Sequence, residues 1–311
     1  MTNLNPIKLN PVFKDYLWGG NKLVKEYNKK CDMPKVAESW ELSVHKDGEN
    51  IIADGEFKGK LLSEYLENNP DAIGERAKVF ENFPILIKFI DAKDNLSIQV
   101  HPDDEYALKN NGEYGKTEMW YILDCEEDSF LYYGFNKEIS KEEFKESIEN
   151  NTVLNYLNKV KVNKGDVFFI EAGTVHAIGK GIVICEIQQN SNTTFRVYDY
   201  DRIDKDGNKR PLHIAEAIEV SKTIPAKNYK RDGNILAQCK YFTAEEVIVT
   251  DKAQLNITEE TFKLVIVVDG YGEIKSGDYV VEIKKGDSIF IPAQNNTFEI
   301  LGKCKLIISC I

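Results

Sequence analysis

The sequence predicts a mainly β protein built from two related β-units, with a few helices inserted between the strands. Most of the chain consists of short runs rich in Val, Ile, Tyr and Phe that are separated by turn residues, a spacing typical of antiparallel sandwiches and barrels. Segments with helical periodicity are few. A stretch that starts at residue 162 is also repeated from residue 283, which indicates that one β-unit occurs twice.

The predicted strands follow one another along most of the chain. In the segment LSIQVHP, which starts at residue 96, Leu96, Ile98 and Val100 fall on one side and polar residues fall on the other. This alternation predicts a strand with one apolar face and one polar face. The expected strands comprise residues 95–101, 118–123, 129–135, 166–172, 181–188, 193–201, 262–270, 278–284 and 305–310.

The predicted helices are recognised mainly by the residues at their starts. Pro102 and three acidic residues favour a helix start after the first polar strand. Ser140 and Glu143 have the spacing of a capping box, and Pro211 lies near the start of the last helical segment. The four expected helices lie within residues 60–69, 102–111, 140–151 and 210–222.

The internal repeat joins two segments that share Lys, Gly, Asp, Phe, Ile and Ala at matching positions. They are VNKGDVFFIEAGTVHAI from residue 162 and IKKGDSIFIPAQNNTFEI, which starts 121 residues later. The upstream strands match at a wider offset, and the helical insert at residues 137–160 of the first copy accounts for the difference. Chance similarity between two amphipathic strands is the alternative explanation.

The first copy of the repeat resembles the second motif of the cupin family, a small β-barrel of the jelly-roll type. That motif has a glycine, a proline, a second glycine and a histidine at fixed spacings. The corresponding positions here are Gly165, Glu171, Gly173 and His176, so a glutamate replaces the proline. The resemblance implies a fold of two cupin-like β-barrels with helical insertions.

The second copy keeps the barrel pattern but not the histidine. Gly286 and Pro292 fit the motif, whereas Gln294 and Thr297 stand where the second glycine and the histidine belong. Only the first barrel can then carry a metal. We therefore expect a catalytic domain at residues 1–234, with an N-terminal β segment and helical inserts, and a C-terminal cupin-like domain without metal ligands at residues 235–311.

Composition limits the classes of partner. The chain has 40 basic and 51 acidic residues, a net charge of −11, and no basic stripe, so nucleic acid is not an expected partner. An anionic ligand would need a local basic pocket. We see neither a signal peptide nor a long apolar run, and the six cysteines form no CxxC pair, so we expect a cytoplasmic protein with reduced thiols and no membrane contact.

Four polar residues have a pattern that suits a metal. Gln99 and His101 are two apart and point off one face of a strand, Glu118 heads the predicted strand that follows, and His176 comes from the repeat. Nitrogen and oxygen ligands without cysteine suit one Zn²⁺ per chain, with Mn²⁺ or Fe²⁺ as alternatives. A single anionic ligand favours a Lewis-acid role. The competing interpretation is a barrel interior in which these side chains bond one another.

Three charged side chains are predicted to face the same interior. Lys116 lies two residues before Glu118, and Glu186 lies opposite an apolar row on its own strand. Arg196 is expected to share a face with Thr194, Tyr198 and Tyr200, opposite Phe195 and Val197. Buried charges are costly unless they are paired or used, so these residues are candidates for a functional site. A purely structural ion pair between Glu186 and Arg196 is the alternative.

Four separated segments together resemble the type I mannose-6-phosphate isomerase family in its shorter bacterial form. They are LSIQVHPDDEYA, GKTEMWYIL, GTVHAIG and EIQQNSNTTFRVYDYDR, with FKDYLWGG and AESWELSVH near the N-terminus in support. The resemblance covers essentially the whole chain, with the segments in the same order. It implies a zinc enzyme of carbohydrate metabolism that interconverts mannose 6-phosphate and fructose 6-phosphate.

The resemblance also implies roles for individual residues. The stretch ESWELS differs from the corresponding stretch of the longer enzymes. Substrate-contacting residues are therefore inferred only from the segments that match the family. The family's catalytic arginine falls on Arg196, and Lys116 and Glu186 match other active-site positions. Its zinc ligands fall on Gln99, His101, Glu118 and His176.

The expected reaction passes a proton between C2 and C1 through a cis-enediol. Arg196, which is always charged, can stabilise the developing oxyanion. Either Glu186 or Lys116 can serve as the base, and the sequence does not choose between them. Lys116 can instead hold the substrate phosphate together with Ser97.

Two other functions fit the same scaffold. A cupin oxygenase would bind Fe²⁺, but its first motif usually has a histidine where Gln99 stands. A non-catalytic double cupin that binds a sugar phosphate is the second alternative. It needs the inward Lys116, Glu186 and Arg196 less than an enzyme does.

Overall fold

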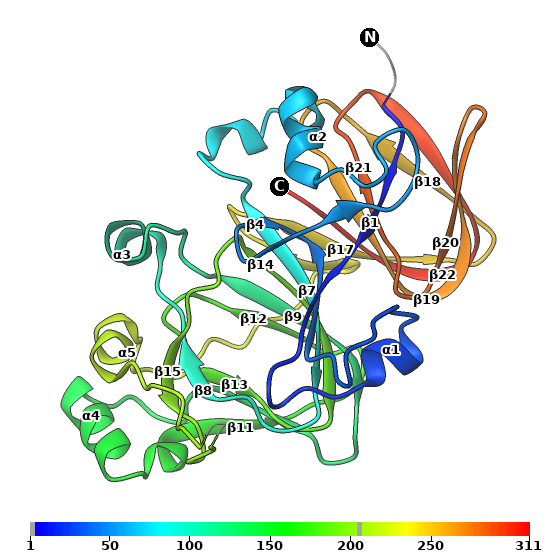
Figure 1. Ribbon diagram of the computed structural model, residues 1–311. Helices are drawn as coiled ribbons and strands as arrows, with labels where there is room; N and C mark the ends of the chain where they lie inside the picture. The colour runs from blue at the N-terminus through cyan, green and yellow to red at the C-terminus, as the bar shows by residue number, and fades with distance from the viewer. Residues whose placement is uncertain (1–3, 204–206) are drawn as a thin grey trace.

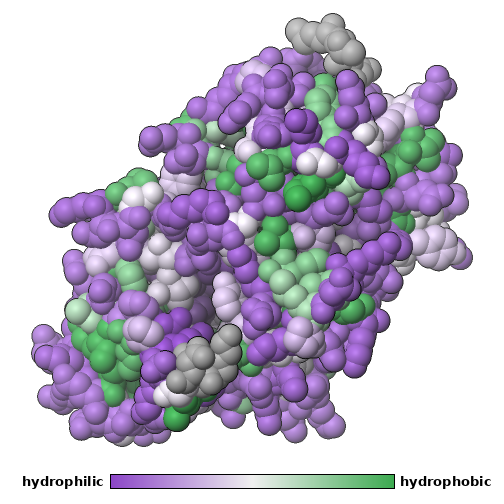
Figure 2. Space-filling view, in the orientation of Figure 1, coloured by the Kyte–Doolittle hydropathy of each residue, from purple (hydrophilic) through white to green (hydrophobic). Residues whose placement is uncertain are grey.

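The computed structural model describes residues 4–203 and 207–311 and shows a mainly β molecule (Figure 1). Its strands form sheets of nine, six, five and two strands, and the strand pairs in all of them are antiparallel. The mainly β fold class predicted from the sequence is confirmed. Most of the face seen in Figure 2 is hydrophilic, with hydrophobic residues in separate patches.

The six-stranded sheet lies at the centre of the fold and is covered on both faces. All eight residues of β14 (Ile182–Gln189) and all eight of β7 (Ile85–Ala92) are buried, as expected for strands packed on two sides. Val183, Cys185 and Ile187 of β14 face one core cluster, whereas Ile182 and Ile184 face another. In spatial order the strands are β12 (Val167–Ile170), β9 (Glu118–Cys125), β14 (Ile182–Gln189), β7 (Ile85–Ala92), β3 (Glu38–Leu42) and β2 (Val12–Lys14).

The five-stranded sheet packs face to face on the six-stranded sheet. Trp120 and Ile184 of the six-stranded sheet share a core cluster with Leu131 and Ile178 of the five-stranded sheet. The two sheets thus form a sandwich whose interior also holds the polar residues described below. The strands of the second sheet, in spatial order, are β11 (Leu157–Lys161), β10 (Phe130–Phe135), β13 (His176–Ile178), β8 (Ile98–Val100) and β15 (Phe195–Tyr198).

The nine-stranded sheet is formed mainly by the C-terminal part of the chain. Its interior is apolar, with Val265, Ile289, Phe298 and Leu306 in one buried cluster. Two strands from the N-terminal part, β1 and β6, join its edge, so the proposed division at residue 234 stays a prediction. The members are β16 (Ile235–Gln238), β17 (Thr243–Val249), β22 (Asn296–Cys310), β19 (Lys263–Ser276), β21 (Ser288–Ile291), β1 (Ile7–Asn10) and β6 (Ile51–Ile52), with β18 (Lys252–Ile257) on β22 and β20 (Tyr279–Lys284) on β19.

The internal repeat is visible in the backbone. Gly165 and Gly286 each have a φ of 91°, and each lies in a turn just before a strand, β12 in the first copy and β21 in the second. This left-handed conformation favours glycine, which explains why both copies keep it. The two segments therefore share local structure as well as sequence.

The helices lie on the outside of the sheets (Figure 1). The capping box of Ser140 and Glu143 is present at the start of α4, and Asp103 caps α3. Pro211 does not begin a helix, because α5 starts only at Ile214. None of the helices in the described ranges is long and apolar enough to cross a membrane. They are α1 (Lys22–Glu26), α2 (Leu62–Asn68), α3 (Asp104–Asn110), α4 (Lys141–Glu149) and α5 (Ile214–Val220).

Short elements complete the fold. A two-stranded ribbon consists of β4 (Val44–His45) and β5 (Gly48–Glu49). Three 3₁₀ helices are η1 (Pro70–Ile73), η2 (Ala77–Val79) and η3 (Val153–Tyr156).

A buried ion pair ties the central sheet to the C-terminal sheet. Lys29 and Glu41 are 5% and 0% exposed, and Lys29 Nζ lies 2.6 Å from the Glu41 carboxylate. Ser39 and Ser288 each donate a hydroxyl hydrogen bond of 2.6 Å to the same carboxylate, and Lys29 also donates to the Gly286 carbonyl. These bonds connect the segment that follows α1 and strand β3 with β21, whose Ser288 lies 247 residues from Glu41 in the sequence.

The variant Lys29→Met is expected to lower the free energy of unfolding by about 3–5 kcal/mol, because it leaves the Glu41 carboxylate buried without its cation. Denaturant titration measures this loss. The matched control is Lys30→Met, which replaces the exposed neighbouring lysine and should change stability by about 0.5 kcal/mol or less. Equal stability of the two variants would contradict the structural role of the pair.

Candidate metal centre and charged cavity

Two histidines and a glutamate meet between the two sheets of the sandwich. One ligand atom each from His101, Glu118 and His176 lies within 4.8 Å of the others, and all three residues are buried. Glu118 is the first residue of β9, His176 is the first of β13, and His101 follows β8. Strands β8 and β13 are paired with Gln99 opposite His176, so segments 77 residues apart in the chain are held side by side.

Hydrogen bonds orient both imidazole rings. The Nδ1 atom of His101 lies 2.9 Å from the Thr193 carbonyl oxygen, and Nδ1 of His176 lies 2.8 Å from the Thr174 carbonyl oxygen. Because a carbonyl oxygen only accepts hydrogen bonds, each Nδ1 carries the hydrogen, and each neutral ring keeps a lone pair on Nε2. This arrangement is typical of histidines that bind a metal through Nε2.

The protonation states of the cluster also suit a cation. Burial lowers the pKa of His176 to about 4, and burial together with the nearby Lys116 charge holds the pKa of His101 well below its usual value. Both rings are therefore neutral at pH 7. His176 Nε2 faces Glu118 Oε1 at 3.3 Å, and this oxygen has no hydrogen-bond donor among the described residues. Two acceptors at that distance repel each other unless a proton or a metal cation lies between them.

The donor set therefore fits a divalent metal. Two imidazole nitrogens and a carboxylate are ligands that Zn²⁺ and similar borderline ions prefer. Burial, and then the negative charge of Glu186, raise the pKa of Glu118, and a bound cation would offset both effects.

Gln99 lies beside this cluster and also lines the cavity next to it. Its side-chain Nε2 is placed 3.4 Å from His176 Nε2. The nitrogen and oxygen of an amide can exchange places by rotation, so the side chain can also turn its oxygen toward the cluster. Direct ligation by Gln99 stays a prediction.

Lys116 connects the cluster to the cavity. Its Nζ lies 2.7 Å from Glu118 Oε2, 3.1 Å from His101 Nε2 and 3.8 Å from Glu186 Oε1. Burial alone would lower the pKa of this ammonium group, but the charges of Glu118 and Glu186 outweigh burial and raise the pKa. Lys116 therefore contributes a positive charge to this site.

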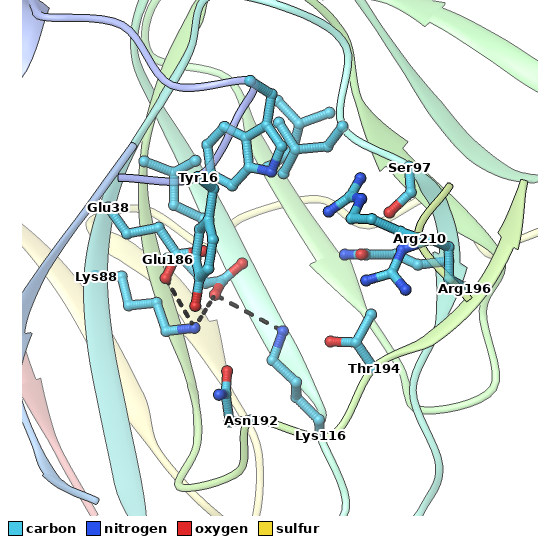
Figure 3. Close-up of a pocket in the computed structure, with 15 residues that line it drawn as sticks. Tyr16, Glu38, Lys88, Ser97, Lys116, Glu186, Asn192, Thr194, Arg196 and Arg210 are labelled. Atoms are coloured by element: carbon cyan, nitrogen blue, oxygen red, sulfur yellow. Dashed lines mark ion pairs between the residues drawn. The ribbon is translucent and has the colours of Figure 1, made fainter. Parts of the chain in front are cut away.

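A cavity of about 260 Å³ opens beside the cluster (Figure 3). Four of its side chains are cationic and two are carboxylates, so it is a locally basic site in a chain of net charge −11. This is the kind of pocket that an acidic protein needs in order to bind an anion. The cavity is lined by Tyr16, Trp18, Glu38, Lys88, Ile90, Leu96, Ser97, Gln99, Lys116, Ile178, Glu186, Asn192, Thr194, Arg196 and Arg210.

The charged side chains occupy two opposite walls. In Figure 3, Lys116 lies on one side with Lys88, Glu38 and Glu186, all of which come from or adjoin the six-stranded sheet. The other side carries Ser97, Thr194, Arg196 and Arg210, which come from β8, β15 and their flanking loops. Every residue that the sequence singled out lies in this cavity or in the adjoining cluster.

Glu186 is held in place by three groups on its own wall. Its Oε2 accepts a 2.9 Å hydrogen bond from Trp120 Nε1, and its Oε1 lies 3.8 Å from Nζ of both Lys88 and Lys116. Burial would raise the pKa of this carboxyl, but the two ammonium groups outweigh it and lower the pKa. Arg196 instead donates to the Pro211 carbonyl oxygen at 2.8 Å, so the alternative of a structural Glu186–Arg196 ion pair is wrong.

The alternation predicted for residues 193–201 holds only in part. Arg196 faces the cavity, and Phe195 and Val197 face the apolar cluster beneath α4 and α5, as expected. The pairing of β15 with β8 is irregular between Arg196 and Tyr198. Beyond that irregularity, Tyr198 and Tyr200 pack against the apolar cluster instead of following Arg196 into the cavity.

Several residues of the cavity were not predicted from the sequence. Lys88 could have been found, because a lysine in the middle of the apolar run ILIKFIDA is too costly to bury without a partner. Its Nζ in fact lies 3.5 Å from Glu38 Oε2. Tyr16 and Arg210 come from irregular segments, where no periodicity indicates the direction of a side chain.

The fold and the site together define a cupin-type protein with a buried cluster that can hold a metal beside a basic cavity. Residues 7–129 match the model of the phosphomannose isomerase type I catalytic domain, and residues 233–311 match the model of the mannose-6-phosphate isomerase cupin domain. The chain belongs to the type I mannose-6-phosphate isomerase family. The resemblance inferred from the sequence motifs and the expected cupin fold are confirmed.

Individual relatives match over nearly the whole chain. Mannose-6-phosphate isomerase ManA of Bacillus subtilis is 39% identical over 314 residues, which cover 98% of each chain. The mannose-6-phosphate isomerase of Streptococcus mutans is 35% identical over 312 residues, again 98% of each chain. A crystal structure of the mannose 6-phosphate isomerase from Bacillus subtilis has a TM-score of 0.91 at 36% identity and covers 99% of this chain and 100% of that chain.

Proposed function

We propose that this protein interconverts D-mannose 6-phosphate and D-fructose 6-phosphate as a metal-dependent aldose–ketose isomerase with one Zn²⁺ per chain. The observation that carries the proposal is the His101–Glu118–His176 cluster, whose two Nε2 lone pairs face the carboxylate beside a basic cavity. Membership of the family and the names of the relatives support this choice of reaction and substrate.

The metal would be held by His101, Glu118 and His176, with Gln99 as the fourth ligand. When bound, it supplies a Lewis acid that polarises the oxygen substituents at C1 and C2 of the sugar. The buried position of the cluster keeps water from competing for the metal.

Glu186 is the better candidate for the base. Its lowered pKa keeps it ionised and able to accept the proton from C2 or C1, whereas the raised pKa of Lys116 keeps that group protonated. Trp120 fixes the Glu186 carboxylate, and Lys88 and Lys116 keep it charged. Arg196, on the opposite wall, would stabilise the negative charge of the enediolate.

The contacts of Lys116 favour a catalytic role over its other predicted role, which is to hold the substrate phosphate. Lys116 contacts Glu118 and His101, so we assign it to the reacting end of the substrate as a charged catalytic residue. Ser97 lies on the wall opposite Lys116, which supports a separate role for Ser97 at the substrate phosphate.

The positions of the site residues support the predicted division into two domains. The residues of the cluster and the cavity all lie between positions 16 and 210, which supports a catalytic domain at residues 1–234 and a domain at residues 235–311 that completes the core.

The cysteines bear on the compartment in which the protein acts. All six are free thiols, which supports action in the reducing cytoplasm.

A coupled assay that follows fructose 6-phosphate formed from mannose 6-phosphate tests the proposed function. We expect turnover, and we expect one deuterium per product molecule at most when the reaction runs in D₂O, because an enediol base exchanges its proton with solvent. Absence of turnover by the metal-loaded protein would exclude the isomerase. Oxygen uptake with hexose phosphates would instead favour an Fe²⁺ oxygenase, and tight binding without turnover would favour the non-catalytic alternative.

A further inference from the structure

We propose that Arg210, held in place by Asp199, binds the phosphate group of the substrate and thereby sets the preference of the enzyme for a phosphorylated sugar. The inference rests on the proposed function, which supplies a hexose 6-phosphate as the substrate. It assigns a role to a residue that the sequence motifs did not indicate.

Asp199 fixes the Arg210 guanidinium at the edge of the cavity. Arg210 Nε donates to Asp199 Oδ2 at 2.8 Å, and Arg210 Nη2 donates to Oδ1 at 2.6 Å, which is a bidentate fork. Asp199 is only 5% exposed, so this pair is little screened by water. A guanidinium has five N–H donors, and the fork uses two of them, so donors remain for a second anion in the cavity.

A strained turn brings this arrangement about. Tyr200 and Asp201 follow Asp199 with φ values of 56° and 54°, a left-handed conformation that two consecutive non-glycine residues rarely adopt. The chain then places Arg202 on the Asp199 carboxylate and closes with a bridge between Ile203 and Lys209. Arg210 follows directly. Such strain persists where the surrounding structure fixes it, and it is concentrated at functional sites.

The wall around Arg210 carries an excess of positive charge. Arg196, Arg202 and Arg210 lie around the single Asp199 carboxylate, and the charges of Arg210 and Arg202 act with burial to lower the pKa of Arg196. A phosphate dianion would offset this charge. Ser97, on the same wall, adds a hydroxyl donor.

The two walls match the two ends of the substrate. Lys116 and Glu186 lie on the wall opposite Arg210 (Figure 3), and Lys116 Nζ lies 2.7 Å from Glu118 Oε2 of the metal cluster. A hexose 6-phosphate carries its phosphate on C6, at the end of the carbon chain remote from the reacting C1 and C2. Arg210 therefore binds the sugar at the end where no bond changes, which affects recognition more than turnover.

The test compares Arg210→Met with wild type in two measurements. The first is the coupled assay with mannose 6-phosphate, in which we expect KM to rise roughly 10- to 100-fold with kcat changed far less, as for loss of a hydrogen-bonded charge pair. The second is calorimetric binding of inorganic phosphate, which should weaken by a similar factor. Arg210→Lys, which keeps the charge but loses the fork, should give an intermediate effect.

Arg202→Met is the matched control. Arg202 also binds Asp199, but among the described residues it does not line the cavity. If Arg210 merely held the turn together, the two methionine variants would raise KM equally, and that result would overturn the proposal. Unchanged phosphate binding by folded Arg210→Met would overturn it as well.

The phosphate measurement separates this inference from the proposed function. If wild type lacks isomerase turnover but binds phosphate through Arg210, the proposed function fails and the anion site stands. If wild type isomerises mannose 6-phosphate and Arg210→Met does so with the same KM, the anion site fails and the isomerase stands.

Discussion

The variant Glu118→Gln is expected to lose its bound metal and to lower kcat by about 1,000-fold or more, since a catalytic metal contributes several kcal/mol to transition-state stabilisation. Glu118 is the one anionic ligand of the cluster, and it faces both His101 and His176. A neutral amide of the same size keeps the packing but removes the charge that holds a divalent cation. Elemental analysis of the purified variant and the coupled isomerase assay measure the two losses.

Glu171→Gln is the matched control for this change. Glu171 is partly exposed, pairs with Lys222 and lies outside the cavity, so its variant should keep both metal and activity. A Glu118→Gln protein with wild-type metal content and wild-type kcat would show that the cluster is not the metal centre. A variant that keeps its metal but loses turnover would assign Glu118 a role in the reaction other than ligation.

The variant Arg196→Ala is expected to lower kcat by about 100- to 1,000-fold, the usual effect of removing one donor to a developing oxyanion. Arg196 lies across the cavity from Glu186 and does not contact the metal cluster in the described part of the chain. Its metal content should therefore stay normal, and KM should change much less than kcat. Steady-state kinetics and elemental analysis of the same preparation measure these quantities.

Arg231→Ala is the matched control, because it removes a guanidinium group that lies outside the cavity. Arg231 pairs with Glu246 beside the C-terminal sheet, outside the cavity. We expect its kcat to stay within about twofold of wild type, as for most surface substitutions. If Arg196→Ala also kept wild-type kcat, the enediolate would be stabilised by other groups, and the assigned role would be wrong.

Local patterns in the sequence located the site residues that lie on regular strands. Alternation in residues 96–102 put Ser97, Gln99 and His101 on one face, and the repeat identified His176. The apolar row of β14 likewise placed Glu186 in the interior. These inferences worked because a strand alternates with a period of two, so one buried side chain determines the direction of its neighbours.

Pairings between distant segments could not be predicted in this way. The edge position of β1 and β6 on the C-terminal sheet depends on contacts between residues more than 200 positions apart, such as Ile7 with Phe290. The irregularity after Arg196 reversed the expected direction of Tyr198, because one extra residue in a strand shifts the alternation. Arg210 is positioned by Asp199 and a left-handed turn, neither of which has a periodic signal.

Titration of Zn²⁺ into chelator-treated protein, with bound metal and isomerase activity measured at each step, tests whether isomerisation depends on a metal bound in this cluster. We predict that the treated protein is inactive and that mannose 6-phosphate turnover rises in proportion to bound metal. The rise should end at one equivalent per chain. Full turnover by protein that contains no metal, or full metal binding without any turnover, would contradict the account.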